Sequence, residues 1–356
     1  MPKLSRTKRQ RRLLIPLIFL VLVLGALSAL TAWYKLNLRP VDSNSSLTKE
    51  FVVTEGSTSK QIAEKLAEKK LIRNALAFRI YLKLEAKDKS LKAGNYYLAP
   101  NLAAAEIIAE LNKGAAAKTF RITFLPGATL ASARERLLNV GYKEAAIDAA
   151  FKKTYDHPLL ASKPAEASLE GFIYGDTYEF FAGVSVESIL ERTFDEMYDA
   201  IKREGLEQKF QAHGLNLYQG IVLASIVQGE AGRLTADMPK VAQIFLNRLK
   251  QGIPLGSDIV IGYRADQINP DRSKTDMSYI GSIECPWNSR RCAGLPPTAV
   301  NNPGINALKA VANPDGAYSD YYYFLTGDDG QMYYAKTEAG HEENKKKHCK
   351  KLCQIL

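Results

Sequence analysis

Glu230 closes the apolar run at residues 221–229 and is the residue of this chain best placed for acid chemistry. In an unbroken helix it shares a face with apolar residues three, four and seven positions earlier: Val227, Ile226 and Leu223. A carboxyl group on such a face is poorly solvated, which raises its pKa and lets it donate a proton near neutral pH. A second interpretation is that the neighbouring glycines, Gly229 and Gly232, fray the helix end and open Glu230 to water.

Motifs for other kinds of chemistry are missing from the sequence. It contains no G-x-G-x-x-G, Walker loop, H-E-x-x-H or G-x-S-x-G, so nucleotide, zinc-protease and serine-hydrolase sites lack their usual support. The histidines are scattered along the chain: His157, His213, His341 and His348. We therefore expect no metal and no cofactor, which leaves carboxylates, hydroxyls and backbone groups for chemistry.

The N-terminus predicts a membrane anchor. A basic cluster within residues 1–12 precedes a charge-free stretch from Leu13 to Tyr34, which as a helix spans about 33 Å, enough for a bilayer core. Because the basic residues lie on one side only, the tail at 1–12 is predicted to be cytoplasmic and the rest of the chain extracytoplasmic. A cleaved signal peptide is the alternative, since residues 26–32 offer small side chains to a peptidase, although the apolar run is longer than a usual signal core.

The sequence after the predicted span is long enough for two or three structural units of α+β class. The strand, glycine turn and helix expected at residues 51–69 recur at 121–141. The smaller unit is either a spacer or a ligand-binding module. In chain order we expect a linker at 35–48, a strand-helix-helix-strand module at 49–116, a mixed α/β domain at 117–344 and a basic tail at 345–356.

The formal net charge of +10 is concentrated at the two ends of the chain. The sequence between them is close to neutral and has no basic patch interleaved with aromatic residues, which argues against nucleic acid as a partner. The C-terminal tail would suit anionic lipid or wall polymer, and it also has the composition of an ordinary solvated charge run.

All four cysteines follow the predicted membrane span: Cys285, Cys292, Cys349 and Cys353. An oxidising compartment favours disulfides, and a bond between Cys285 and Cys292 would close a short loop. Four cysteines allow three pairings, and the sequence leaves the choice open. A zinc site at Cys349, Cys353 and His348 is a rival interpretation, with loose spacing in a lysine-rich segment.

Two further segments stand out by composition. The segment Glu170–Phe180 surrounds a turn with aromatic residues, acids and hydroxyls. This composition is typical of a surface that stacks on sugar rings, and equally of an aromatic corner of the core. The second segment is an amphipathic helix at 241–249, which contains Asn247 and leads through a glycine turn to Ser257 and Asp258.

Six ordered motifs resemble those of the MltG (YceG-like) family of endolytic murein transglycosylases. In chain order they are Glu170 to Tyr178, Leu223 to Glu230, Phe245 to Leu249, Leu255 to Asp258, Gly294 to Pro297 and Asn302 to Leu308. The chain departs from the family pattern in several places. Gln228 stands where many relatives carry an acid, Gly229 where a longer residue is common, and Gly175 where a proline often precedes the aspartate. Because Gln228 cannot be the essential acid, the catalytic role falls on Glu230.

The resemblance implies that the module at 49–116 is LysM-like and that the domain at 117–344 cleaves glycan strands of nascent peptidoglycan, with Glu230 as the catalytic residue. It implies a groove for the glycan, with peptidoglycan, the membrane through one helix and peptidoglycan synthases as candidate partners. Asp258 could instead cap a turn, and we expect Arg248 to be an ion-pair partner. The groove residues expected from polarity and resemblance are Ser257, Asp258, Asn247, Glu170, Asp176 and Tyr178.

One carboxyl group suffices for the lytic reaction that the resemblance implies. The glutamate protonates the oxygen between N-acetylmuramic acid and N-acetylglucosamine and then takes a proton from the muramic 6-hydroxyl, which closes on C1. The product is a 1,6-anhydro end, which would terminate strand elongation. Two rivals are a hydrolytic muramidase that uses Glu230 with Asp176 or Asp258, and a non-catalytic scaffold that binds the wall.

Overall fold

The structure is a computed structural model that describes residues 6–85, 91–114, 119–232, 234–271, 281–351 and 353. It confirms the predicted α+β class. Two compact units make up the chain, one of residues 1–120 with 179–188 and one of residues 121–178 with 189–356. Within the described residues, each sheet has two strands.

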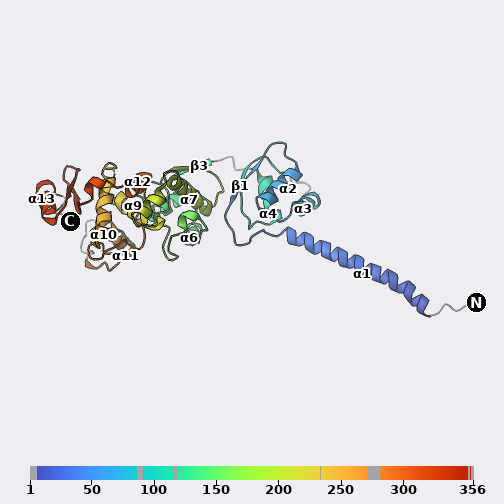
Figure 1. Ribbon diagram of the computed structural model, residues 1–356. Helices are drawn as coiled ribbons and strands as arrows, with labels where there is room; N and C mark the ends of the chain where they lie inside the picture. Colours follow the sequence, from blue (N-terminus) through green and yellow to red (C-terminus); the bar gives the residue numbers. More distant parts are fainter. Residues whose placement is uncertain are drawn as a thin grey trace, which may run out of the picture. The chain divides into compact units, whose positions relative to one another are not determined.

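Helix α1, Arg6–Asn37, is continuous through the predicted span (Figure 1). Its part Leu20–Asn37 has the length and the mean hydropathy, 1.4, of a membrane-crossing helix. The large apolar side chains of this part are exposed, an arrangement that suits lipid better than water. The helix continues past Tyr34 to Asn37, whose side-chain amide donates a hydrogen bond of 2.8 Å to the Trp33 carbonyl in the preceding turn.

The smaller unit contains the order strand, helix, helix, strand. Strands β1 and β2 pair antiparallel, with Lys49 opposite Leu98 and Val53 opposite Gly94. Thr58 caps α2 in a box with Gln61, as a turn before a helix requires. The elements are β1 (Lys49–Val53), α2 (Ser59–Glu68), α3 (Ala75–Leu84), β2 (Gly94–Leu98) and a further helix, α4 (Ala104–Lys113).

Alternate side chains of β1 contribute to the hydrophobic core of this unit. Phe51 and Val53 are buried, whereas Glu50 and Val52 are exposed, as expected of a half-buried strand. The helices contribute apolar faces to the same cluster, which includes Ile62, Leu66, Phe78, Ile107 and Leu111. Burial of each such side chain stabilises the unit by about 1.5–3 kcal/mol relative to exposure.

The recurring strand-turn-helix pattern corresponds to β3, Thr119–Thr123, and α5, Leu130–Asn139. Strand β3 pairs with β4, Thr177–Phe181, in a sheet separate from that of β1 and β2. Thr129 caps α5 by accepting a hydrogen bond from the Ser132 amide. The second copy therefore keeps the local elements but pairs its strand elsewhere. A short helix, α6 (Glu144–Lys152), follows.

Helix α9, Leu217–Ala231, is the central helix of the larger unit. It packs against α8 (Leu206–Ala212), α10 (Met238–Gln251), α11 (Asp258–Ile268) and α12 (Ile305–Ala312). From Gly220 to Val227 every residue of α9 is buried. The helix is therefore apolar on all sides, a property of core helices, and not only on the stripe that the spacing predicts. Helix α7, Val186–Arg203, precedes these elements.

The C-terminal part contains an antiparallel hairpin, β5 (Tyr323–Thr326) with β6 (Met332–Ala335), and helix α13 (Glu338–His348), which packs against both strands. The first residues of the predicted basic tail form the last turn of α13. The structure pairs Cys285 with Cys292 and Cys349 with Cys353. The cysteines of the rival zinc interpretation are thus bonded to each other.

Candidate active site

Glu230 lies in the last turn of α9, which is intact up to Ala231. Asn216 and Gln219 begin the helix with a capping box. At the other end, Gly232 has a φ of 54° and donates its backbone N–H to the Gln228 carbonyl at 3.0 Å. The two ends hold the helix, so the glutamate is carried on a rigid element.

Gly229 lets α11 approach the end of α9. A Cβ atom at this position would lie 2.8 Å from Cγ2 of Ile259, closer than carbon atoms tolerate. The absence of a side chain therefore permits contact between the two helices. Because Ile259 lies in the first turn of α11, this contact brings the start of that helix next to Glu230.

The carboxyl group of Glu230 is only partly exposed and accepts one side-chain hydrogen bond. Oγ of Ser257 donates to its Oε1 at 2.6 Å. Burial raises the pKa of Glu230 to about 7, and the nearby negative charge of Asp258 acts in the same direction. The Ser257 hydroxyl and the Arg248 charge lower the pKa but do not outweigh burial. At neutral pH this group can therefore give up a proton and take one back.

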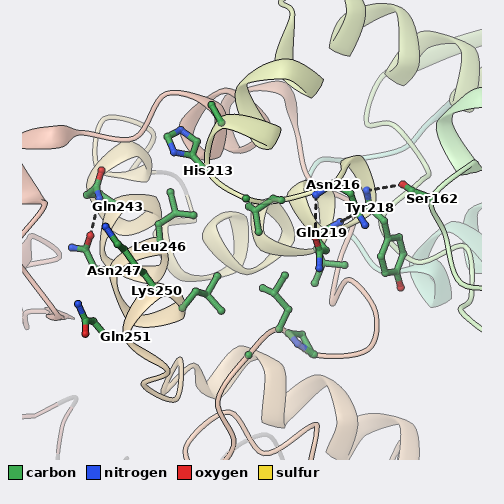
Figure 2. Close-up of a pocket in the computed structure, with 18 of the residues that line it drawn as sticks. Ser162, His213, Asn216, Tyr218, Gln219, Gln243, Leu246, Asn247, Lys250 and Gln251 are labelled. Atoms are coloured by element: carbon green, nitrogen blue, oxygen red, sulfur yellow. Dashed lines mark hydrogen bonds between the residues drawn. The ribbon is translucent and has the colours of Figure 1, made fainter.

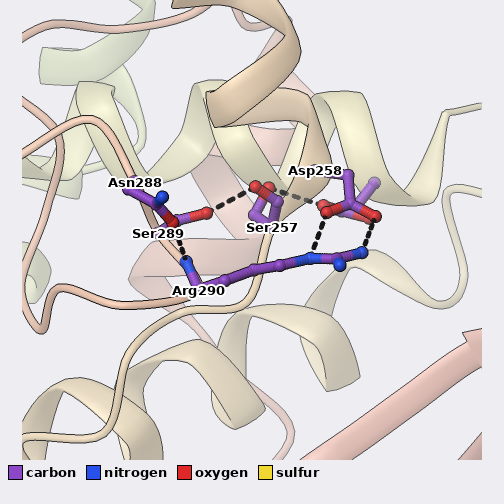
Figure 3. A network of polar contacts seen from close by, with 6 residues as sticks. Ser257, Asp258, Asn288, Ser289 and Arg290 are labelled. Atoms are coloured by element: carbon purple, nitrogen blue, oxygen red, sulfur yellow. Dashed lines mark hydrogen bonds and ion pairs between the residues drawn. The ribbon is translucent and has the colours of Figure 1, made fainter. Parts of the chain in front are cut away.

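The Ser257 side chain is buried next to the Glu230 carboxylate. It is 1% exposed, its hydroxyl is committed to Glu230, and its carbonyl accepts a hydrogen bond of 2.5 Å from Oγ of Ser289 (Figure 3). Asp258, the first residue of α11, binds Arg290 through both carboxylate oxygens at 2.8 Å. Both side chains join the start of α11 to its surroundings.

Glu170 is a second carboxyl group with a raised pKa, and it is buried. Its oxygens accept hydrogen bonds from the Leu130 backbone N–H at 2.9 and 3.0 Å and from the Tyr263 hydroxyl at 3.0 Å. Burial still raises the pKa of Glu170 to about 7, because the cost of desolvation exceeds the gain from these donors. Glu170 thus ties the start of α5 to α11.

The other residues expected in the groove also contact the protein. Asp176 is exposed, and its Oδ1 accepts the Thr177 backbone N–H at 2.6 Å. Tyr178 is buried and donates its hydroxyl to the Tyr174 carbonyl at 2.9 Å. Asn247 is 8% exposed, and its Nδ2 donates to two backbone carbonyls at 2.8 and 2.9 Å. Among the described residues, no hydrogen bond joins these three side chains to Glu230.

Arg248 holds backbone groups, in contrast to the ion pair that the sequence predicts. Its guanidinium donates to the carbonyls of Tyr322 at 2.7 Å, Leu255 at 2.7 Å and Pro254 at 3.2 Å. It thereby fixes the glycine turn that precedes Ser257. The charge of Arg248 still acts on Glu230 through space.

A depression of about 360 Å³ lies beside the C-terminal end of α9. Tyr174 and Gly175 line it together with Gln228, whose Oε1 accepts the Gly304 backbone N–H at 3.1 Å. Sequence reasoning missed Tyr174, although it stands between two residues that were selected, Glu170 and Tyr178. It is partly exposed where they are buried, a difference that aromatic composition alone cannot reveal.

A larger groove of about 1020 Å³ lies at the other end of α9 (Figure 2). Amide side chains line it, including Asn216 and Gln219 of the α9 cap and Gln243 and Gln251 of α10. Asn247 belongs to this groove, while Glu230 does not. Two surface hollows therefore flank the central helix, and the smaller one adjoins the carboxylate-bearing turn.

Within the described part of the chain, no cluster of three or more His, Cys, Asp or Glu side chains could hold a metal ion.

The YceG-like family model matches residues 51–347 of this chain. The chain belongs to the YceG-like family. An endolytic murein transglycosylase from Bacillus subtilis is 26% identical over 335 residues, which cover 87% of this chain and 88% of the relative. One from Streptococcus pneumoniae serotype 2 is 28% identical over 340 residues, 88% of this chain and 60% of that longer protein. A crystal structure of a YceG-like protein from Listeria monocytogenes aligns with a TM-score of 0.52 and 25% identity, over 83% of this chain and 98% of that one.

The Glu170→Gln variant is expected to lose part of the pH dependence of stability. The pKa of Glu170 is about 7 in the folded state against an ordinary 4.5, so the folded state holds this proton more tightly than the unfolded chain. Its stabilising contribution is complete below pH 4.5 and is lost as the pH rises to 7, by up to about 3 kcal/mol. Denaturant unfolding at pH 5 and pH 8 should show a smaller difference for the variant than for the wild type. An equal difference in both proteins would contradict the raised pKa.

Proposed function

We propose that this chain is an endolytic murein transglycosylase in which Glu230 is the general acid and base. The observation that carries the proposal is the position of Glu230: a desolvated carboxyl group with a pKa near neutrality, on the last turn of the central helix. Relatives that carry this activity in their names align over most of the chain. Its substrate is the glycan strand of peptidoglycan.

The first step uses Glu230 as an acid. Its proton passes to the oxygen that joins C1 of N-acetylmuramic acid to N-acetylglucosamine, and the C1–O bond breaks as positive charge develops at C1. A pKa of about 7 keeps a large fraction of Glu230 protonated at neutral pH. Ser257 fixes one carboxyl oxygen and so limits the orientations of the acid.

The second step uses the same group as a base. The Glu230 carboxylate takes the proton of the muramic 6-hydroxyl, whose oxygen bonds to C1 and closes the 1,6-anhydro ring. No water is consumed, and the glutamate is protonated again at the end of the cycle. The tethered hydroxyl acts at a high effective concentration, of the order of 10⁵ M or more in well-oriented cases.

The pairing of Asp258 supports the lytic reaction over hydrolysis. A glycoside hydrolase needs a second carboxylate as nucleophile or as base for water. Asp258 is the carboxylate whose charge acts on Glu230, and Arg290 binds both of its oxygens. A carboxylate held in this manner is a poor nucleophile, so the tethered hydroxyl is the better acceptor for C1.

The placement of the enzyme follows from α1. We propose that this helix anchors the chain in the cell membrane with its N-terminus in the cytoplasm, so that both units face the nascent wall. The smaller unit would serve as a LysM-like wall-binding module, and peptidoglycan synthases are the proposed protein partners. Cleavage at that place would terminate strand elongation.

Digestion of purified glycan strands in heavy-oxygen water tests the reaction type. The full-length protein in detergent should yield muramic ends lighter than reducing ends by the mass of one water and free of the heavy isotope. Muramic ends that are reducing and carry the heavy oxygen would identify a hydrolase. Binding without fragments would favour the scaffold.

A further inference from the structure

The loop Ile283–Cys292 is closed by the Cys285–Cys292 disulfide, with Cα atoms 5.9 Å apart. Inside the loop, Asn288 is 1% exposed and donates its side-chain amide to the Ile283 carbonyl at 2.9 Å. The Cys292 backbone N–H returns to the Asn288 carbonyl at 2.9 Å. The loop is thus folded around one buried asparagine, and the disulfide joins the two ends of that fold.

This loop binds the chain on both sides of Ser257. The Gly256 backbone N–H donates to the Ser289 carbonyl at 2.7 Å, and Oγ of Ser289 donates to the Ser257 carbonyl at 2.5 Å. One residue further on, Arg290 binds Asp258 through two hydrogen bonds of 2.8 Å. Three consecutive residues, 256 to 258, are therefore held by two consecutive loop residues. Figure 3 shows the contacts of Ser257 and Asp258.

We propose that the disulfide-closed loop is the positioning element of the catalytic carboxylate, with Ser289 and Arg290 as positioning residues that act on Glu230 through Ser257 and Asp258, respectively. The proposal rests on the function proposed above. Ser257 is the side chain that hydrogen-bonds to Glu230, and the loop fixes its backbone. Its hydroxyl can donate to the carboxylate only while residues 256–258 keep their place.

Loss of the loop contacts is predicted to shift the pKa of Glu230 in one direction. Donation from Ser257 favours the charged form of Glu230 and lowers its pKa, while the negative charge of Asp258 raises it. Removal of Ser289 contacts frees Ser257, and removal of Arg290 leaves Asp258 unneutralised. Both changes raise the pKa of Glu230. Glu230 would stay protonated, and so able to act as the acid, up to a higher pH. Its carboxyl group would, however, be less well oriented for both proton transfers.

The chain provides a matched control in its second disulfide. Cys349–Cys353 lies at the end of α13, and within the described part of the chain neither cysteine is hydrogen-bonded to residues 256–258 or to Glu230. The test compares full-length proteins in detergent: Ser289→Ala, Arg290→Gln and Cys285→Ser/Cys292→Ser against Cys349→Ser/Cys353→Ser. Ser289→Thr keeps the hydroxyl and serves as the rescue variant. The measurement is kcat on glycan strands as a function of pH, with thermal unfolding recorded for each protein.

We expect the loop variants to lower kcat by about 3- to 10-fold, the effect of one or two misplaced hydrogen bonds. The alkaline limb of their pH profile should move to higher pH, and the control and Ser289→Thr should match the wild type. A fall in kcat with an unmoved limb would mean that the loop is merely structural and would overturn the proposal. Wild-type behaviour of Ser289→Ala and Arg290→Gln would overturn it as well, and Arg290 is exposed enough for that variant to fold. Undiminished cleavage by Glu230→Gln would instead refute the proposed function.

Discussion

Glu230→Gln is expected to reduce glycan cleavage by at least about 10³-fold, because an amide can neither donate the proton to the glycosidic oxygen nor take it from the 6-hydroxyl. The substitution keeps the shape of the side chain, and its carbonyl oxygen can still accept the hydrogen bond from Ser257. The loss should therefore fall on kcat, with the fold and the affinity for peptidoglycan retained. The measurement is the initial rate of fragment release, together with co-sedimentation of the protein with peptidoglycan.

Glu343→Gln is the matched control for this experiment. Glu343 lies on α13 with an exposed side chain that pairs with Lys347, so the same chemical change occurs at a solvated position. It should leave the cleavage rate within about twofold of the wild type. If Glu230→Gln retained a similar rate, Glu230 would not be the acid and the mechanism would be wrong.

Ser257→Ala is expected to lower kcat by about 10- to 100-fold, which corresponds to the loss of one hydrogen bond to a charged group. Without the hydroxyl, Oε1 of Glu230 has no side-chain donor, and both its pKa and its rotational freedom rise. The KM should change little, because Ser257 is 1% exposed and is therefore not accessible to a glycan.

A pH profile of the Ser257→Ala variant separates this role from simple destabilisation. The alkaline limb should move upward, and Ser257→Thr, which restores a hydroxyl, should recover most of kcat. An increase in KM at constant kcat would show instead that Ser257 contacts the glycan. That outcome would support the prediction, made from polarity and the family resemblance, that Ser257 lines the glycan groove.

The helix that carries Glu230 can be predicted from the sequence because a local residue pattern determines it. Eight consecutive buried residues in α9, Gly220 to Val227, are apolar or small, and the last five of them belong to the motif Leu223 to Glu230. The hydrogen-bond partner of Glu230, in contrast, cannot be predicted from a local pattern. Ser257 is 27 positions away, and contacts between distant segments, such as that between Gly229 and Ile259, bring it to the carboxylate. No periodicity within either segment encodes that approach.

Polarity alone does not show when a side chain binds the backbone. Asn247 lines the larger groove, and its amide also donates to carbonyls more than seventy positions away, at Tyr318 and Tyr321. Ser289 and Arg290 do not stand out in the sequence, since they lie in a short polar loop outside the six motifs. Their importance arises from the fold of that loop around Asn288, which the sequence does not reveal.

The central claim is that Glu230 holds its proton near neutral pH, and a direct titration of its carboxyl carbon tests it. Full-length protein with isotope-labelled glutamate, compared by NMR with Glu230→Gln, isolates the signal of this residue. The account predicts a midpoint at a pH of about 7. A midpoint near 4.5, the ordinary value for a glutamate, would mean that the group is ionised at neutral pH and would contradict its role as the acid.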